Sequence, residues 1–310
     1  MTSRRPLPPT AVRVAVGSAT FLLFAANTLF WCSLLYLVTF LKLVVPVPPW
    51  RRLASRLLVW IGESWIAVNT FGLRLTQPTR HDVRGLEGLR RDVSYLVVSN
   101  HQSWVDIPVL QGVFLRKIPF LRFFLKQQLI RVPVLGLAWW ALDFPFMKRH
   151  SREALERNPE LRHEDLAATR RACERFRNAP ASILNFVEGT RFTPAKHARS
   201  GSPFRHLLPP KAGGLAFAAS AMGPQLAGIV DVTIVYPDGS PTFWDLISLG
   251  LPEVVVRVRE RPVPKEWFTG DYAEDAAFRE GVQEWVRLLF AEKDATIDGL
   301  LASRPGQAAR

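Results

Sequence analysis

The chain has 310 residues, of which 48% are hydrophobic and 22% charged, and its formal net charge is +13. This length allows one large domain or two modest ones, and the composition excludes both wholesale disorder and a polytopic membrane protein. The two cysteines, Cys32 and Cys173, lie far apart, so neither a disulfide framework nor a cysteine-based zinc site is indicated. The positive charge predicts an anionic partner: nucleic acid, acidic lipid, or a phosphorylated or acidic protein.

The first 62 residues contain no acidic side chain, and the run 14–41 carries no charge. As a tilted helix this run would cross the roughly 30 Å hydrocarbon core of a bilayer, so residues 1–52 are expected to form a membrane-anchoring segment. The alternative is a buried hairpin in a soluble protein. Residues 53–82 are expected to form an amphipathic helix and a linker, with the helix lying either on lipid headgroups or on the domain. A single span, a hairpin and interfacial anchoring all remain open.

The sequence pattern of residues 83–302 is that of one globular domain, and a flexible tail is expected at 303–310. Strands are expected at 95–99, 182–187, 230–235 and 254–258, with an edge strand within 142–147. Helices are expected at 105–115, 163–177, 213–222 and around 278–289, and a polar loop at 192–205. Strands that alternate with helices predict an α/β domain in which helices flank a mixed sheet.

Among the six histidines, His101 stands apart because it follows an expected strand and precedes Asp106 by five residues. If a helix begins after Ser103, the carboxylate lies in its first turn and can reach back to the imidazole. A carboxylate on one ring nitrogen fixes the tautomer and leaves the other nitrogen free to accept a proton. This arrangement predicts a general base; the alternative is a histidine that caps a helix. Ser103 has no nucleophile-elbow setting, which argues against a covalent acyl-serine, and the histidines show no metal-ligand spacing.

A second element, EGTR at 188–191, follows the expected strand 182–187. Glycine allows the backbone to approach a ligand closely, and an arginine can bind phosphate in a bidentate manner. A surface turn with a solvated Glu–Arg pair is the structural alternative.

Taken in this order, the two motifs resemble the glycerolipid acyltransferase family, that of the 1-acylglycerol-3-phosphate acyltransferases. The resemblance rests on NHQSWVD at 100–106, LDFPFMKR at 142–149 and EGTR at 188–191, and it covers about residues 53 to 260. It is strongest towards a bacterial inner-membrane branch of probable acyltransferases. By this resemblance the catalytic pair is His101 and Asp106. Substrate contacts are implied at Asn100, Lys126, Arg149, Glu188, Gly189, Thr190, Arg191 and Lys211.

The resemblance implies acyl transfer from acyl-CoA or acyl-acyl carrier protein to a lysophospholipid hydroxyl, with 1-acylglycerol-3-phosphate as the expected acceptor. It implies no resident cofactor, a bacterial cytoplasmic membrane location, and a catalytic domain that faces the cytoplasm. Backbone N–H groups near Gly189 are the expected oxyanion donors. Two alternatives remain: acylation of another lysophospholipid or a lipid A precursor, and a membrane-tethered basic binding protein without activity. No nucleic-acid module is recognised, and the oligomeric state is not indicated.

Overall fold

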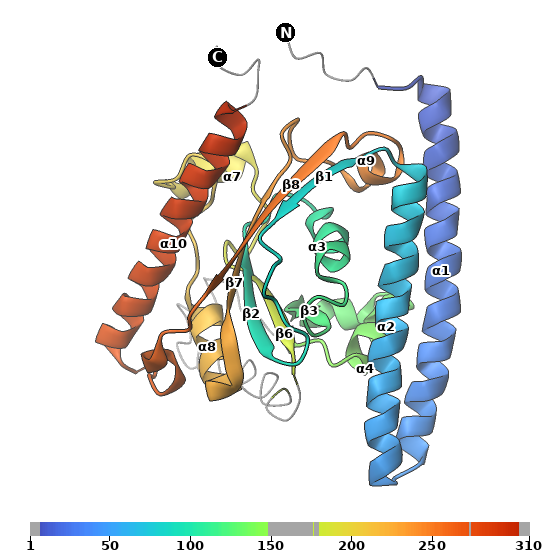
Figure 1. Cartoon of the computed structure of the whole chain (residues 1–310), viewed down its shortest axis with the longest axis horizontal. Helices are drawn as coiled ribbons and strands as arrows, with labels where there is room; N and C mark the ends of the chain where they lie inside the picture. The colour runs from blue at the N-terminus through green and yellow to red at the C-terminus, as the bar shows by residue number, and fades with distance from the viewer. Residues whose placement is uncertain (1–6, 148–175, 177–179, 273, 304–310) are drawn as a thin grey trace.

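The computed structural model describes residues 7–147, 176, 180–272 and 274–303. It begins with two long helices, α1 (Thr10–Val44) and α2 (Pro48–Thr76), which run side by side in opposite directions (Figure 1). Prolines occupy the first turn of α2, where a missing backbone N–H costs nothing because no carbonyl precedes it in the helix. The boundary expected at residue 52 therefore falls inside α2.

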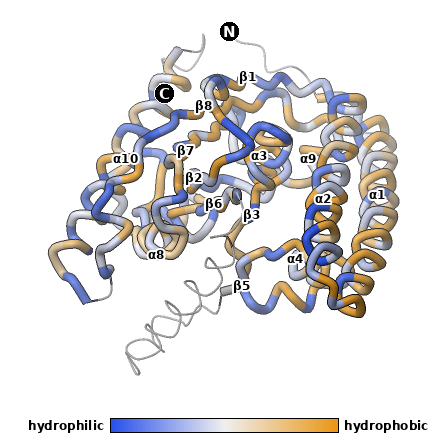
Figure 2. The backbone as a smooth tube through the Cα atoms, turned by 60° about the horizontal axis from the view of Figure 1, so that its bottom comes forward, coloured by the Kyte–Doolittle hydropathy of each residue, from blue (hydrophilic) through white to orange (hydrophobic). Residues whose placement is uncertain are grey.

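The helical hairpin formed by α1 and α2 exposes much of its apolar surface. Within the described residues, α1 is the one helix that is long and apolar enough to cross a membrane: its most apolar window has a mean hydropathy of 1.9 and is 11% buried. Figure 2 shows hydrophobic residues along both helices of this hairpin. The hairpin also contacts the domain. Arg13 forms an ion pair with Asp245 at 3.1 Å, and the hydroxyl of Tyr36 donates to the carbonyl of Val134.

A six-stranded sheet forms the centre of the domain, in the order β1-β8-β7-β2-β6-β3. Its strands are β1 (Arg80–Arg84), β2 (Ser94–Ser99), β3 (Leu121–Phe123), β6 (Ser182–Phe186), β7 (Leu226–Val235) and β8 (Glu253–Arg261). Only the β7–β8 pair is antiparallel. The mixed sheet flanked by helices agrees with the fold class expected from the sequence.

Hydrophobic cores cover both faces of the sheet, which is why β2 is apolar along its length rather than alternating. Tyr95 and Val97 face a core shared with the hairpin and α3 (Asp106–Phe114). Leu96 and Val98 face a core shared with α8 (Gly213–Met222) and α10 (Ala276–Ala302). Figure 1 shows these helices on opposite sides of the sheet.

Several elements differ from the sequence prediction. The edge strand expected within 142–147 is reduced to β5 (Phe146–Met147), which pairs with β4 (Leu125–Lys126), because the chain turns at Asp143 with a positive φ of 59°. The expected polar loop at 192–205 contains α7 (Pro194–Ser200). Strand β1 was not predicted. The helix expected at 163–177 lies outside the described residues, apart from Phe176.

The remaining short elements connect these layers. They are α4 (Leu135–Ala141), α9 (Phe243–Ile247) and the 3-10 turns Gln127–Arg131, Gly223–Gln225 and Lys265–Phe268. Because β2, β6 and β7 are mutually parallel, the loops that follow them, at 100–106, 187–193 and 236–242, meet at one edge of the sheet. Open α/β sheets bind ligands at this edge.

Candidate active site

The predicted catalytic pair is in contact. The Nδ1 atom of His101 lies 2.7 Å from Oδ2 of Asp106, which begins α3. The same oxygen accepts hydrogen bonds from the backbone N–H groups of Gln102 at 2.7 Å and Ser103 at 3.0 Å. Because Oδ2 already accepts two backbone hydrogen bonds, it acts as an acceptor towards the ring as well. In the neutral ring Nδ1 then carries the proton, and Nε2 is the basic nitrogen.

The other oxygen of the Asp106 carboxylate is held by a residue that the sequence reasoning missed. The hydroxyl of Tyr236, just beyond β7, donates to Oδ1 at 2.8 Å. Burial and the neighbouring carboxylate raise the pKa of Tyr236 well above its usual value, so it remains a neutral donor. Its position at the end of a predicted strand was visible in the sequence, but no local spacing connects it to Asp106.

The imidazole ring is fixed on a second side by Phe186, whose ring stacks on that of His101 at a centroid distance of 3.9 Å. The histidine side chain is 13% exposed. Nowhere in the described part of the chain does a hydrogen-bond partner occupy Nε2. The ring therefore has one nitrogen committed to Asp106 and the other available to a proton donor.

Glu188 is buried and contacts the loop at 100–106 rather than facing solvent. Its Oε1 accepts from the backbone N–H of His101 at 2.8 Å, and its Oε2 from that of Leu208 at 2.9 Å. Burial raises the pKa of Glu188 to about 7, against the effect of these two hydrogen bonds. Both oxygens thus hold backbone N–H groups, and the substrate contact expected from the resemblance stays a prediction.

Asn100 is likewise occupied. Its side-chain amide donates to the carbonyl of Ile234 and accepts from the N–H of the same residue, both at 2.9 Å. The residue is fully buried. These two hydrogen bonds join the loop at 100–106 to β7, and a substrate contact through this side chain, which would break them, stays a prediction.

The EGTR turn brings its arginine to the catalytic loop. The guanidinium of Arg191 lies 4.5 Å from the ring centroid of Trp104, a cation–π contact between the two predicted motifs. In the described residues it has no carboxylate partner. Lys196, which the sequence reasoning missed, donates from Nζ to the hydroxyl of Thr190 at 2.7 Å and to the carbonyl of Arg191 at 3.1 Å.

Gly189 has a φ of 69°, the left-handed conformation that glycine adopts without a steric penalty. Its N–H donates to the carbonyl of Phe186 at 2.8 Å, so this amide is not available to an oxyanion. The expectation that donors lie near Gly189 therefore cannot apply to this N–H itself.

The other predicted cations are exposed or lie outside the described residues. Lys126 is exposed on β4. Lys211 is exposed, and its backbone N–H donates to the carbonyl of Val187 at 2.8 Å, beside the EGTR turn. Arg149 lies outside the described residues. No group of three or more metal-ligating side chains occurs in the part of the chain that the structure describes.

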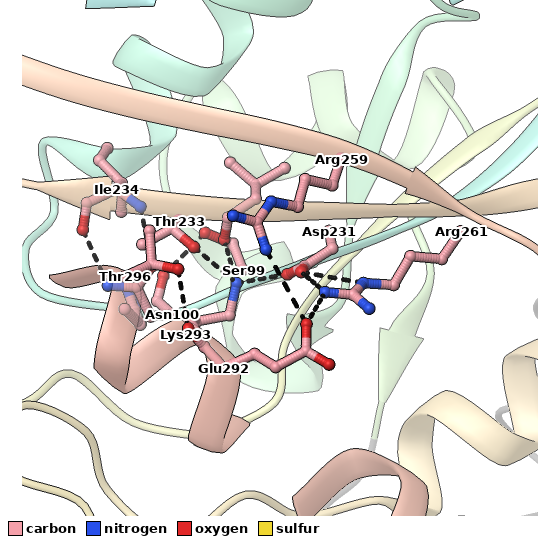
Figure 3. A network of polar contacts seen from close by, with 12 residues as sticks. Ser99, Asn100, Asp231, Thr233, Ile234, Arg259, Arg261, Glu292, Lys293 and Thr296 are labelled. Atoms are coloured by element: carbon pink, nitrogen blue, oxygen red, sulfur yellow. Dashed lines mark hydrogen bonds and ion pairs between the residues drawn. The ribbon is translucent and has the colours of Figure 1, made fainter. Parts of the chain in front are cut away.

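A buried polar network supports this edge of the sheet from the α10 side (Figure 3). The ammonium of Lys293 donates to Oδ1 of Asp231 at 2.5 Å and to the carbonyl of Val232 at 2.6 Å. Arg261 holds the other oxygen of Asp231 at 3.1 Å. Burial lowers the pKa of Lys293, although the Asp231 carboxylate acts in the opposite direction. The network lies on the same strand as Ile234, the partner of Asn100.

The order and geometry of these motifs define the class of the protein. The Acyltransferase family model matches residues 80–237, which hold every predicted site residue, and the chain belongs to this family. The computed structure is also similar to the crystal structure of the 1-acyl-sn-glycerophosphate (LPA) acyltransferase PlsC from Thermotoga maritima. The TM-score is 0.53 and the sequence identity 20%, covering 90% of this chain and 98% of that one. This likeness shows a shared fold.

The chain is also similar in sequence to several curated acyltransferases. The chain is 29% identical over 272 residues to 1-acyl-sn-glycerol-3-phosphate acyltransferase 2 of Arabidopsis thaliana, covering 81% of this chain and 61% of the relative. It is 26% identical over 181 residues to 1-acyl-sn-glycerol-3-phosphate acyltransferase gamma of Mus musculus, covering 55% of this chain and 43% of the relative. The chain thus spans between about two fifths and three fifths of the length of the curated relatives it matches.

Proposed function

We propose that this protein is an O-acyltransferase that moves a fatty acyl chain from acyl-CoA or acyl-acyl carrier protein to the free hydroxyl of 1-acylglycerol-3-phosphate. The product is phosphatidic acid. The observation that supports this most directly is the 2.7 Å contact between His101 and Asp106, with Nε2 left without a partner among the described residues. The names of the curated relatives supply the acceptor.

In the proposed mechanism Nε2 of His101 removes the proton from the acceptor hydroxyl, and the resulting oxygen attacks the thioester carbonyl carbon. Asp106 stabilises the imidazolium that forms. When the tetrahedral intermediate collapses, the carbon–sulfur bond breaks and the thiolate takes the proton from the imidazolium. The acyl thioester is a co-substrate, and the reaction needs no resident cofactor.

The oxyanion of the intermediate needs hydrogen-bond donors. Since the N–H of Gly189 is occupied, we assign this role to the next two amides, those of Thr190 and Arg191. Neither N–H has a hydrogen-bond partner within the described residues. The Arg191 guanidinium binds the acceptor phosphate in this proposal, with Lys126, Lys211 and Arg149 as further cations.

The helical hairpin brings the protein to its lipid substrate. Arg13 near one end of α1 and Tyr36 nearer the other both contact the domain, so α1 cannot cross a bilayer fully while the domain stays on one side. We therefore propose that the hairpin lies along the membrane, with its apolar side in the lipid. The site would face the cytoplasmic side of a bacterial inner membrane, where both acyl donors reside.

The central experiment is transfer of a labelled acyl chain from acyl-CoA to 1-acylglycerol-3-phosphate by the purified full chain. His101→Ala should lower kcat by about 10²–10⁴-fold, because it removes the general base. His81→Ala, at an exposed histidine of β1, is the matched control and should leave the rate unchanged. A wild-type rate in His101→Ala would rule the mechanism out.

A panel of lysophospholipids in the same assay identifies the acceptor headgroup. If transfer to another lysophospholipid or to a lipid A precursor is faster, that compound is the acceptor instead of 1-acylglycerol-3-phosphate. Thiol release that does not depend on any acceptor would indicate a thioesterase.

A further inference from the structure

A basic cavity of about 950 Å³ lies between α2 and the turn that leads into β3. Five cationic side chains and two carboxylates line it. The cations are Lys42, Arg56, Arg91, Arg116 and Arg122, and the carboxylates are Glu63 and Asp143. The excess of positive charge matches an anion that bears more than one negative charge, such as a phosphate group.

Arg122 is the buried part of this cavity. It is 7% exposed and projects from β3 between the rings of Phe120 and Phe176, at 5.3 and 5.1 Å from their centroids. Its Nε donates to the carbonyl of Leu142 at 2.8 Å. Burial lowers its pKa to about 10, although the Asp143 carboxylate acts in the opposite direction. A guanidinium held out of water in this way is stabilised when an anion enters the cavity.

Apart from Arg122, the cavity holds more positive charge than its carboxylates can neutralise. Arg91 donates to both oxygens of Glu63 at 2.6 Å, and Arg116 lies 4.0 Å from the same carboxylate. That carboxylate is therefore already neutralised. Across the described residues neither Lys42 nor Arg56 forms an ion pair or a side-chain hydrogen bond. These two cations are available to a ligand.

The cavity is separate from the proposed active site. Arg91 precedes β2, whereas His101 follows it, so the two lie at opposite ends of the strand. Six residues at about 3.3 Å each place them about 20 Å apart along the sheet. One phosphate cannot contact both groups.

The surroundings of the cavity are those of a lipid-binding surface. Arg56, Trp60 and Glu63 recur at helical spacing and line the cavity from one face of α2. Trp60 is exposed, as are Leu41 and Leu43 on either side of Lys42. Cations beside exposed apolar and aromatic side chains are typical of the membrane interface.

We propose that this cavity binds the phosphate headgroup of an anionic phospholipid, at a second site that does not take part in acyl transfer. Lys42 and Arg56 contact the headgroup from the hairpin, and Arg122 contacts it from the sheet. The bound lipid thereby links the membrane-facing hairpin to the domain. A free phosphate ion satisfies the same charges, but it makes no use of the apolar surface around the opening.

The test measures binding of short-chain dihexanoylphosphatidate to the purified full chain by titration calorimetry. All proteins carry Arg191→Leu, which removes the main phosphate contact proposed at the active site, so that any binding left there is the same in every protein compared. Lys42→Gln/Arg56→Gln should raise Kd by about tenfold or more, because two charge-assisted contacts are lost. Arg122→Gln should have a similar effect; since it alters a buried residue, its fold is checked by circular dichroism.

The matched control is Arg199→Gln/Lys265→Gln, which removes two exposed cations elsewhere. An unchanged Kd in Lys42→Gln/Arg56→Gln, or an equal loss in the control, would overturn the proposal. Inorganic phosphate that binds as tightly as the lipid would overturn the assignment to a lipid. With Arg191 restored, Lys42→Gln/Arg56→Gln should retain wild-type acyl transfer to soluble short-chain acceptors, which separates this site from the proposed catalytic function.

Discussion

Glu188 couples the protonation state of one buried carboxyl to the backbone of His101, the proposed general base. Its side chain joins the N–H groups of His101 and Leu208, which are far apart in the sequence. The carbonyl of His101 is in turn held by the N–H of Phe192 at 2.7 Å. The loop that carries the imidazole is thus held by residues in and next to the EGTR motif, and Glu188 is the buried residue of that motif.

Glu188→Gln tests this role through the pH dependence of stability. Because the folded-state pKa of about 7 lies above the ordinary value of 4.5, the folded protein holds this proton more tightly than the unfolded chain does. Its contribution to stability is therefore fully present below about pH 4.5 and is lost as the pH rises towards about 7, by on the order of 3 kcal/mol.

The glutamine variant should lack this loss, so the free energy of unfolding in urea, compared between variant and wild type across this pH range, measures it. Glu284→Gln, at an exposed glutamate, is the control. Parallel pH profiles for wild type and Glu188→Gln would contradict the assignment.

Arg191→Lys should raise KM for the acceptor more than it lowers kcat. Lysine retains the charge but loses the planar fork that binds phosphate and stacks on Trp104. The measurement is the KM and kcat of acyl transfer at varied acceptor concentration, with Arg199→Lys as the control. Unchanged kinetic constants in Arg191→Lys would show that Arg191 does not bind the acceptor.

At the residue scale, the sequence predicted the parts of the site that are local. The His101–Asp106 contact follows from the spacing of the two residues and from the start of a helix between them. The hydroxyl of Tyr236 reaches Asp106 across 130 positions, and a single sequence contains no signal for that contact. Glu188 and Asn100 were recognised as motif residues, but the direction of their side chains depends on the assembled sheet.

At the scale of elements, the attachment of α10 to β7 depends on the buried pair of Lys293 and Asp231. Lys293→Met should lower the free energy of unfolding by about 3 kcal/mol, because it leaves a buried carboxylate without its ammonium partner. Chemical denaturation measures the change. The exposed Lys265→Met is the control, and it should change stability by less than about 0.5 kcal/mol.

A second variant separates the charge effect from simple packing. Lys293→Met combined with Asp231→Leu removes both buried charges and should recover part of the lost stability. A double variant that is as unstable as the sum of the two single variants would show that the pair does not interact energetically.

Helices and strands were predictable from the sequence where their burial requires a pattern of apolar residues. The helix at 213–222 was expected with the same bounds as α8, and the expected strand at 95–99 is β2 without its first residue. Strand β1 has the sequence RHDVR and lies at the edge of the sheet, where exposure removes the apolar signal. Helix α7 begins with a Thr193 cap and Pro194, but its polar sequence has the composition of a loop.

At the scale of the whole molecule, the apolar face of α1 should determine binding to membranes. Leu22, Leu29 and Phe40 are exposed and lie on one side of the helix, because their spacings of 7 and 11 residues are close to whole turns. Replacing all three with glutamine should weaken partition into phospholipid vesicles by more than about tenfold, since burying each side chain is worth about 1.5–3 kcal/mol.

Vesicle flotation measures this partition, and Leu288→Gln on α10 is the control for an exposed leucine outside the hairpin. Equal flotation of the triple variant and wild type would show that the hairpin does not provide the lipid contact.

The hydroxyl of Tyr236 that holds Asp106 has a consequence for biosynthesis. During translation the histidine and its carboxylate emerge from the ribosome early, but the residue that completes their hydrogen bonds is added more than a hundred codons later. Strand β7, which carries it, must also insert between β2 and β8 before it can reach the site. A truncated or still-growing chain therefore lacks the hydrogen bond from Tyr236 to Asp106 until β7 has joined the sheet.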